Sequence, residues 1–339
     1  MNVISTNNMS QSVDTAIPIN CIEDFTHFGT LQAPLSDTVI ELSNEHRQQA
    51  MSIIAAGLCS LNLHAVENSA AKRVIGQASA IARLDCTITS QGKLAGYEVE
   101  ERPSGLGIVH TITQRFIGES MVKGSLQSHF RETFDGQLPT VLISPNRDYG
   151  TDDHLILPTE TLGFAEGKPL ILVRAEPLEV NGALLESLVP RSISTIADKG
   201  LKLGRIDEGL ARLVCEPTDL PTADESFVIK PARGSKAKGI LTYLTPSDIR
   251  LYGKAGTSTH TKVRKKLMIL SNDNKMLCEP FRPPIRVELS AAKGANLLLR
   301  LLATVSKETI VIIGGTYVAR PNIIIHGARD AFSGAILVQ

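Results

Sequence analysis

The chain has 339 residues, 42% of them hydrophobic and 21% charged, so it can bury a sizeable core in two or three subdomains. Its formal net charge is zero and it contains no tryptophan, which argues against a general binder of nucleic acids or anionic membranes. Five scattered cysteines form no CxxC pair, a pattern typical of reduced thiols in a cytoplasmic protein.

The N-terminal segment, residues 1–30, is polar and rich in Asn and Ser, and we expect it to be a flexible tail. It lacks the basic and apolar regions of a secretory signal peptide. The apolar runs elsewhere in the chain have the length of strands and are too short to span a bilayer. We therefore expect a protein without membrane segments.

The segment 31–125 alternates between helical and strand patterns. Met51, Ile54 and Leu58 recur at helical spacing in its first part. Further on, two strand-like stretches are joined by a turn at Gln91-Gly92. We expect helices at 44–60, 66–82 and 105–122 and strands at 84–89 and 94–100.

The rest of the chain divides into a small α/β domain at 126–215 and a C-terminal half at 216–339. A basic run in the predicted helix 258–270 is either a solvated face or the entry to a ligand cleft. The small domain has strand candidates at 139–144 and 169–173 and a helix near 182–188. In the C-terminal half we expect a strand at 227–231 that begins a new sheet, and then one antiparallel sheet with strands at 276–281, 285–290, 297–305 and 309–318.

Three carboxylates lie on the predicted hairpin: Asp85 on the first strand, and Glu98 and Glu100 on the second. Residues two apart on a strand point to one face, and the hairpin brings Asp85 toward the same face. Converging carboxylates repel each other unless a cation neutralises them, and Mg²⁺ is a hard ion that suits such ligands. On spacing alone, a solvated hairpin with ordinary surface acids is the favoured interpretation.

A second motif combines a strand lysine with a glycine-rich turn. Lys230 ends an apolar strand before Pro231, where its ammonium can reach a nucleotide phosphate. Gly234 and Gly239 allow backbone N–H groups to turn toward phosphate oxygens, and Ser235 adds a hydroxyl. The segment is not a Walker A motif, and a surface loop is the alternative interpretation of the turn alone.

Together the two motifs resemble the ATP-grasp superfamily. The family pattern of an acid, a hairpin and Glu-x-Asn matches Asp85 and Glu98 but differs at Glu100, where the family usually has Asn. In that family the lysine and loop come first and the carboxylates last, whereas this chain has the opposite order. The order resembles circularly permuted ATP-grasp enzymes such as eukaryotic-type glutathione synthetase. The helices and hairpin that follow the last strands in unpermuted relatives stand here at 44–105.

The resemblance implies an α+β protein of permuted ATP-grasp fold, in which two small sheets sandwich the nucleotide and 126–215 is an inserted α/β substrate domain. It implies ATP as the nucleotide and Mg²⁺ held by Asp85, Glu98 and Glu100. It also implies a catalytic Arg320 directed at the γ-phosphate and a Glu279 that holds adenine and ribose. The residues expected at the ATP phosphates are Lys199, Lys230, Gly234, Ser235 and Gly239.

The implied function is an ATP-dependent carboxylate–amine or carboxylate–thiol ligase. The substrate carboxylate would form an acyl phosphate, which an amine then displaces through an oxyanion that Arg320 could stabilise. We expect small amino-acid- or peptide-like substrates, no nucleic-acid or membrane partner, a cytoplasmic location and compatibility with a homodimer. An ATP-grasp-type phosphotransferase and a nucleotide-binding regulatory protein without ligase activity are the alternatives.

Overall fold

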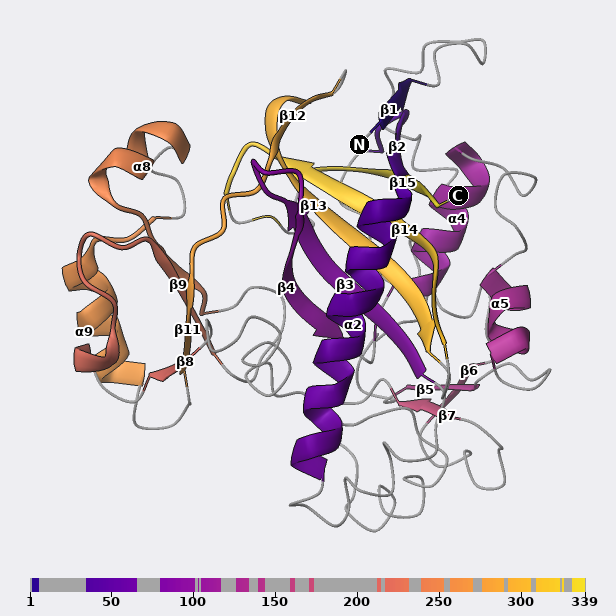
Figure 1. Ribbon diagram of the computed structural model, residues 1–339, viewed down its shortest axis with the longest axis horizontal. Coiled ribbons are helices and arrows are strands. Elements are labelled where there is room, and N and C mark those ends of the chain that lie inside the picture. Colours follow the sequence, from indigo (N-terminus) through magenta and orange to yellow (C-terminus); the bar gives the residue numbers. More distant parts are fainter. Residues whose placement is uncertain are drawn as a thin grey trace.

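The chain is a mixed α+β protein built on a large sheet, which has eight strands in the part of the chain that the structure describes (Figure 1). The strand order is β1-β2-β15-β14-β13-β3-β4, and β12 pairs with β13. The pairing of β15 with β2 is parallel and the other pairings are antiparallel. The strands are β1 Asn2–Ser5, β2 Thr38–Leu42, β3 Ala80–Ile88, β4 Leu94–Glu100, β12 Arg286–Leu289, β13 Ala292–Val305, β14 Ile310–Arg320 and β15 Phe332–Val338.

The structure is a computed structural model. It describes residues 2–5, 35–65, 80–100, 103, 105–116, 126–133, 140–143, 159–161, 171–173, 212–214, 217–231, 239–252, 257–270, 276–289, 292–305, 309–323, 325 and 331–338. Among these, no helix is long and apolar enough to cross a membrane.

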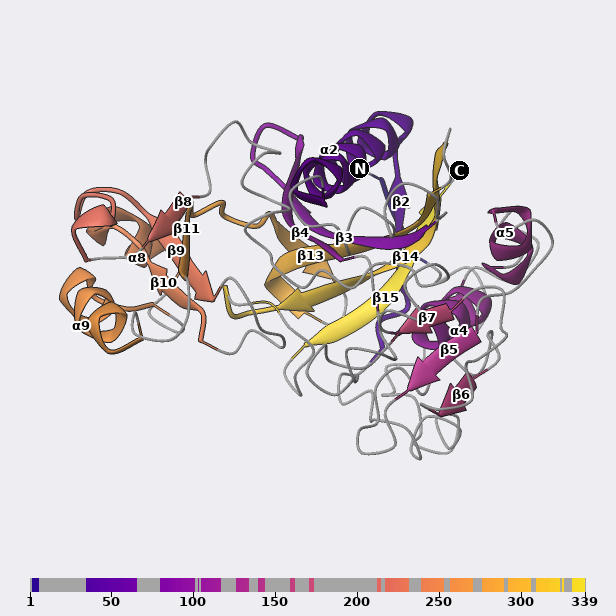
Figure 2. The ribbon, with the colours of Figure 1, turned by 90° about the horizontal axis from the view of Figure 1, so that it is seen from below.

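The two faces of the large sheet differ because side chains alternate along each strand. Leu84, Leu299 and Leu301 point to one face, where helix α2 (Asn44–Ala65) covers them through Ile54. Helix α4 (Leu106–Phe116) packs on the other face, at the β15 end of the sheet (Figure 2). That second face also carries the charged residues of β3 and β4.

A separate four-stranded sheet, in the order β10-β9-β11-β8, lies to one side of the large sheet (Figures 1 and 2). Helix α9 (His260–Leu270) packs on it by burying Val263 and Leu267 against Phe227. The basic residues of α9 are exposed, as the solvated-face interpretation expects, and a role at the entry to a ligand cleft stays untested. The strands are β8 Arg212–Val214, β9 Phe227–Pro231, β10 Leu241–Tyr243 and β11 Met276–Pro280. Helix α8 (Pro246–Tyr252) lies between β10 and α9 in the chain.

Within the predicted domain 126–215, the structure describes a helix and a small parallel sheet. The helix is α5 (Leu126–Thr133), and the sheet order is β6-β5-β7. Strand β8, near the end of the same range, pairs with β11 and so belongs to the four-stranded sheet. The parallel strands are β5 Thr140–Ile143, β6 Thr159–Thr161 and β7 Ile171–Val173.

Several expectations require correction. Residues 80–82, expected at the end of a helix, begin β3, because they continue the ladder with β13. Strand β11 pairs with β9 instead of joining β12, β13 and β14, and the sheet that holds those three strands is large, not small. Residues 2–5 form β1 and are not part of a flexible tail. The predicted helices at 66–79 and 182–188 lie outside the described residues.

Candidate active site

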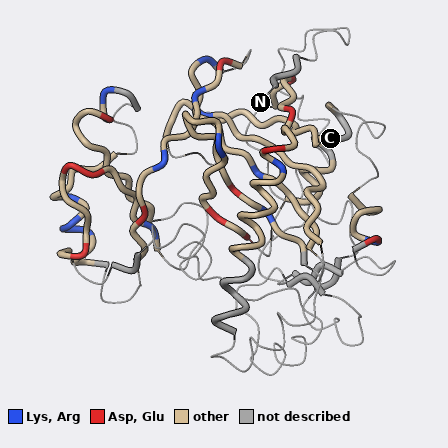
Figure 3. Tube along the Cα trace, in the orientation of Figure 1, with Lys and Arg blue, Asp and Glu red and all other residues tan. Residues whose placement is uncertain are grey.

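The hairpin of β3 and β4 carries four charged residues (coloured along the trace in Figure 3), and their alternation with buried residues places them on one face of the large sheet. In the register of the hairpin Asp85 lies opposite Glu98, and Arg83 lies opposite Glu100. Their neighbours Leu84 and Val99 are fully buried on the other face. The hydrophobic alternation of the two strands therefore fixes which way the charged residues point.

A bulge interrupts the hairpin beside this charged group. Asp85 pairs with Glu98 but the next residue, Cys86, pairs with Gly96, so Tyr97 is an extra residue in β4. The ring of Tyr97 packs against Leu298 and Val318 of the large sheet. Bulges redirect side chains and are common next to active sites.

Arg83 is held by two carboxylates. Its Nε donates to Asp85 Oδ1 at 2.7 Å, and its Nη2 lies 3.3 Å from Asp85 Oδ2 and 2.6 Å from Glu100 Oε2. Burial on its own lowers the pKa of Arg83, but the charges of Asp85 and Glu100 outweigh burial and raise the pKa overall. The guanidinium therefore stays charged and stabilises both carboxylates.

Arg300 on β13 approaches the same carboxylate from the neighbouring strand. It lies opposite Asp85 in the ladder, and its Nε is 3.8 Å from Asp85 Oδ2. Burial lowers the pKa of Arg300, an effect that the charge of Asp85 opposes and that of Arg83 reinforces. Neither arginine was predicted from the sequence to have a role in the site. Two signals were present: Arg83 is two residues from Asp85 on one strand, and Arg300 interrupts a run of leucines.

Lys230 lies where the two sheets meet. Only 6% of the residue is exposed, and its Nζ forms an ion pair with Glu279 at 2.7 Å. The same Nζ donates to the backbone carbonyl of Tyr97 at 3.1 Å. Because Tyr97 directly precedes Glu98, the predicted phosphate lysine lies next to the predicted metal hairpin.

Arg282, in the segment between β11 and β12, makes a second contact with the bulge of β4. Its Nη1 donates to the carbonyl of Gly96 at 3.0 Å, while the Tyr97 hydroxyl donates to the carbonyl of Arg282 at 2.9 Å. The bulge thus bonds to Lys230 of the four-stranded sheet and to the segment that connects this sheet to β12.

The glycine-rich turn is described only at its end. Gly239 has φ +83°, and a Cβ on it would lie 3.0 Å from Pro231 Cγ, so this position requires glycine. The turn therefore returns close to the strand that carries Lys230. Lys199, Gly234 and Ser235 lie outside the described residues, and their roles stay predictions.

Arg320 is placed away from the carboxylates. It ends β14 opposite Asn296, whereas Arg300 on the same ladder lies opposite Thr316. The separation of four residues corresponds to roughly 13 Å along a strand. The arginines that the structure brings to Asp85 are Arg83 and Arg300, and a catalytic role for Arg320 stays a prediction.

The carboxylates fit Mg²⁺ in donor chemistry but do not form a complete protein site. In the described part of the chain, no group of three or more His, Cys, Asp or Glu residues is arranged to hold a metal ion. However, Mg²⁺ at nucleotide sites commonly takes one or two carboxylates and completes its shell with phosphates and water. Asp85 and Glu98 lie opposite each other in register and could supply such carboxylates. Arg83 engages Asp85 as well as Glu100, so the ligand roles of all three acids stay predictions.

Comparisons with known proteins identify no family. No family model matches the chain, and no curated protein matches it. One solved structure that aligns with the chain is that of a "Putative gamma-glutamylcysteine synthetase" from Methylobacillus flagellatus KT. The TM-score is 0.39 and the identity 11%, over 79% of this chain and 82% of that one. A TM-score this low carries no argument about function.

Proposed function

We propose that this protein is an ATP-dependent ligase of the circularly permuted ATP-grasp type, which joins a carboxylate to an amine or a thiol. The contact between the Lys230 ammonium and the Tyr97 carbonyl carries this proposal, because it joins residues 133 positions apart in the sequence. Through it, the lysine strand meets the carboxylate hairpin, although the chain presents the two motifs in reversed order.

The pairing of the large sheet supports the permutation. The hairpin strand β3 pairs along its length with β13, which in turn pairs with β14. Strand β14, which ends at Arg320, is thus separated from the hairpin by β13. In addition, β2 pairs in parallel with β15, so residues 38–42 and 332–338 belong to the same sheet as the hairpin.

The nucleotide would lie where the two sheets meet. Lys230 and the backbone near Gly239 would face the phosphates from one side, and Asp85 and Glu98 would hold Mg²⁺ on the other. Mg²⁺, when bound with ATP, would neutralise charge on the phosphate oxygens. Glu279, expected at the adenine and ribose, is the residue that holds the Lys230 ammonium in place before a phosphate arrives.

The reaction would need no side-chain nucleophile. An oxygen of the substrate carboxylate attacks the γ-phosphorus, the bond to ADP breaks, and an acyl phosphate forms. The amine or thiol then attacks the acyl carbon and releases inorganic phosphate. The chain's contribution is to position the reactants and to stabilise negative charge with Lys230 and the hairpin arginine Arg83.

A regulatory nucleotide-binding protein is the second candidate, and one observation favours it. Arg83 already neutralises Asp85 and Glu100, so the hairpin is stabilised without a metal. A cytoplasmic location, a homodimer and small amino-acid- or peptide-like substrates stay predictions.

A product assay separates the candidates. The purified protein is incubated with ATP, Mg²⁺ and a panel of carboxylic acids and amines, and ADP, phosphate and organic products are quantified. A ligase yields ADP, phosphate and an amide or thioester in equal amounts. ADP with a stable phosphorylated substrate would instead indicate a phosphotransferase, and nucleotide binding without any turnover a regulatory protein.

A further inference from the structure

Arg300 stands out as a charged residue in an apolar strand. It lies within the sequence Leu297-Leu298-Leu299-Arg300-Leu301-Leu302 of β13. Leu299 and Leu301 point into the core under α2, so Arg300 points to the opposite face with Asp85 and Thr316 as its ladder neighbours. A hydrophobic residue at this position would extend the apolar run, so packing alone does not explain an arginine.

The guanidinium of Arg300 is incompletely satisfied. Its Nε is buried and has no hydrogen-bond partner. Asp85 Oδ2 is 3.8 Å away, beyond hydrogen-bond range, and both oxygens of Asp85 already interact with Arg83. A buried donor without an acceptor costs free energy, and such groups in native proteins call for an explanation. The lowered pKa of Arg300 agrees with a cation whose burial is not fully compensated.

We propose that Arg300 binds an oxygen anion of the reacting substrates, either a phosphoryl oxygen or a carboxylate oxygen. This inference rests on the proposed function for the identity of the anion. Nε and one Nη of a guanidinium form a planar fork that matches two oxygens of a phosphate or a carboxylate. The side chain as a whole is 29% exposed, so it is not sealed from solvent although Nε itself is buried.

The charges around Arg300 add a condition to this binding. Three carboxylates (Asp85, Glu98 and Glu100) lie near two guanidiniums (Arg83 and Arg300), so the site carries excess negative charge. An entering anion is repelled unless a cation accompanies it. Anion binding that depends on Arg300 should therefore be stronger with Mg²⁺ than without it.

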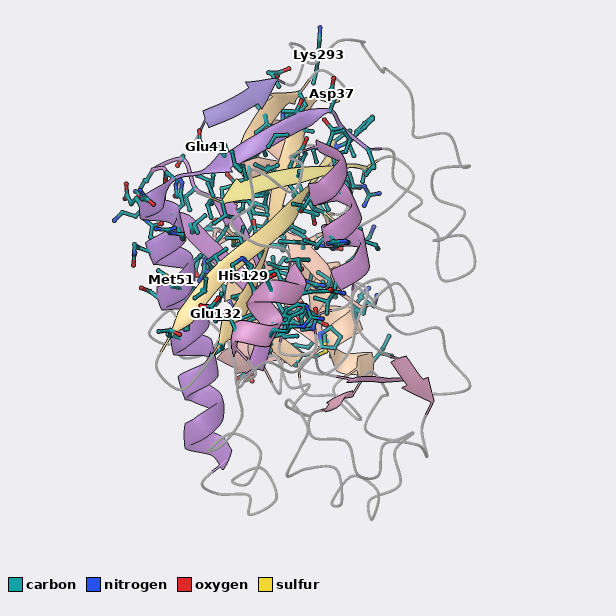
Figure 4. All side chains as sticks on the ribbon, turned by 90° about the vertical axis from the view of Figure 1, so that its right-hand side faces the viewer. Asp37, Glu41, Met51, His129, Glu132 and Lys293 are labelled. Atoms are coloured by element: carbon teal, nitrogen blue, oxygen red, sulfur yellow. The ribbon has the colours of Figure 1, made fainter. Side chains whose placement is uncertain are left out.

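The test is calorimetric titration of wild type, Arg300→Met and Arg300→Lys with ATP, inorganic triphosphate and succinate, each with and without Mg²⁺. Lys293→Met is the matched control, because this substitution also removes one positive charge from β13. Lys293 itself is exposed and points outward (Figure 4). We expect Arg300→Met to reduce the binding affinity for at least one of the anions about tenfold or more, which is the scale of one charged hydrogen bond. Arg300→Lys, which keeps the charge but loses the fork, should be intermediate, and the control should match wild type.

The probes distinguish the source of the anion. Weaker binding of ATP and triphosphate assigns Arg300 to a phosphate group, and weaker binding of succinate alone assigns it to the substrate carboxylate. If Arg300→Met binds every probe as tightly as Lys293→Met does, the inference is wrong. If Arg300→Met fails to fold, Arg300→Lys is compared with Lys293→Met in the same way, provided that its melting temperature equals that of wild type.

The same data separate this inference from the proposed function. Wild type that does not bind ATP contradicts the proposed function, and the triphosphate and succinate titrations still test Arg300. Wild type that turns over ATP, together with Arg300 variants indistinguishable from the control, contradicts only the inference. Wild type that binds none of the probes contradicts both.

Discussion

At the scale of single residues, Arg83 and Glu98 have different roles on the charged face of the hairpin. Arg83 forms ion pairs with Asp85 and Glu100, and these pairs offset the repulsion that three neighbouring carboxylates would otherwise cause. Glu98 lies opposite Asp85 and next to the backbone carbonyl that binds Lys230. Glu98 is therefore the carboxylate whose charge most directly tests the proposed metal site.

Glu98→Gln should abolish most Mg²⁺-dependent ADP formation while the protein remains folded. The substitution removes a charge and keeps the shape, so we expect a loss of about a hundredfold or more, as when one preorganised electrostatic contact is removed. The measurement is steady-state ADP release as a function of Mg²⁺ concentration. Glu288→Gln, on the exposed face of β12, is the control and should leave the rate unchanged. Full turnover in Glu98→Gln would show that Glu98 holds no metal.

Lys230→Met should lose both nucleotide affinity and stability. Removing one partner of a buried ion pair leaves Glu279 uncompensated, which costs about 3 kcal/mol. The double variant Lys230→Met/Glu279→Gln removes the unpaired charge and should recover most of the stability. It should not recover ATP affinity if Lys230 contacts phosphate.

The two variants are compared by chemical denaturation and by calorimetric titration with ATP. Lys262→Met on the exposed side of α9 controls for the loss of one lysine. An ATP affinity in the double variant equal to that of the control would assign Lys230 a structural role only.

At the scale of elements, helix α2 and the hairpin are joined through His46. The Ser43 hydroxyl accepts from the His46 backbone N–H at 3.2 Å, as an N-cap does, and contacts His46 Nδ1 at 2.8 Å. His46 Nε2 lies 2.7 Å from the carbonyl of Gly92 in the hairpin turn. Because a carbonyl only accepts, Nε2 carries the proton and Nδ1 accepts from Ser43.

Ser43→Ala should destabilise the protein by about 1 kcal/mol, the usual cost of losing an N-cap. The free energy of unfolding is measured by urea denaturation. Ser52→Ala is the control, because Ser52 is exposed within the same helix and bonds only to the Gln48 carbonyl. Equal stabilities for the two variants would mean that Ser43 does not cap α2.

Elements set by local patterns were predictable from the sequence, and those set by long-range pairing were not. The hairpin followed from its alternation and from the Gln91-Gly92 turn, where Gly92 has φ +76°. Strand β11 has the same apolar character as its neighbours in sequence, so nothing local indicated that it pairs with β9. The helix predicted for residues 80–82 was wrong for the same reason, because their strand conformation depends on pairing with β13.

The candidate site was predictable in part. Asp85, Glu98, Lys230 and Glu279 were chosen from motifs, and the structure places the first two opposite each other and pairs the other two. Arg300 was missed because its closeness to Asp85 depends on the pairing of strands more than 200 positions apart in the sequence. A motif search that compares neighbours along the chain does not detect such a contact.

At the scale of the whole molecule, the bulge of β4 is the point where the two sheets join. Lys230 of the four-stranded sheet donates to the carbonyl of Tyr97 in the large sheet. Arg282, in the segment that connects β11 to β12, donates to the carbonyl of Gly96. A nucleotide bound there would have its phosphates between the lysine strand and the carboxylate face. The proposed function depends on this shared position, since neither sheet alone supplies both a phosphate lysine and metal ligands.

The most direct test of a shared site is an experimental structure with Mg²⁺ and a non-hydrolysable ATP analogue. We predict a triphosphate located between the two sheets, with Lys230 Nζ bonded to a phosphate oxygen. Mg²⁺ should bridge the phosphates to Asp85 and Glu98. A nucleotide bound elsewhere, or one that contacts Lys230 while its metal contacts neither Asp85 nor Glu98, would contradict the shared site and the ligase proposal with it.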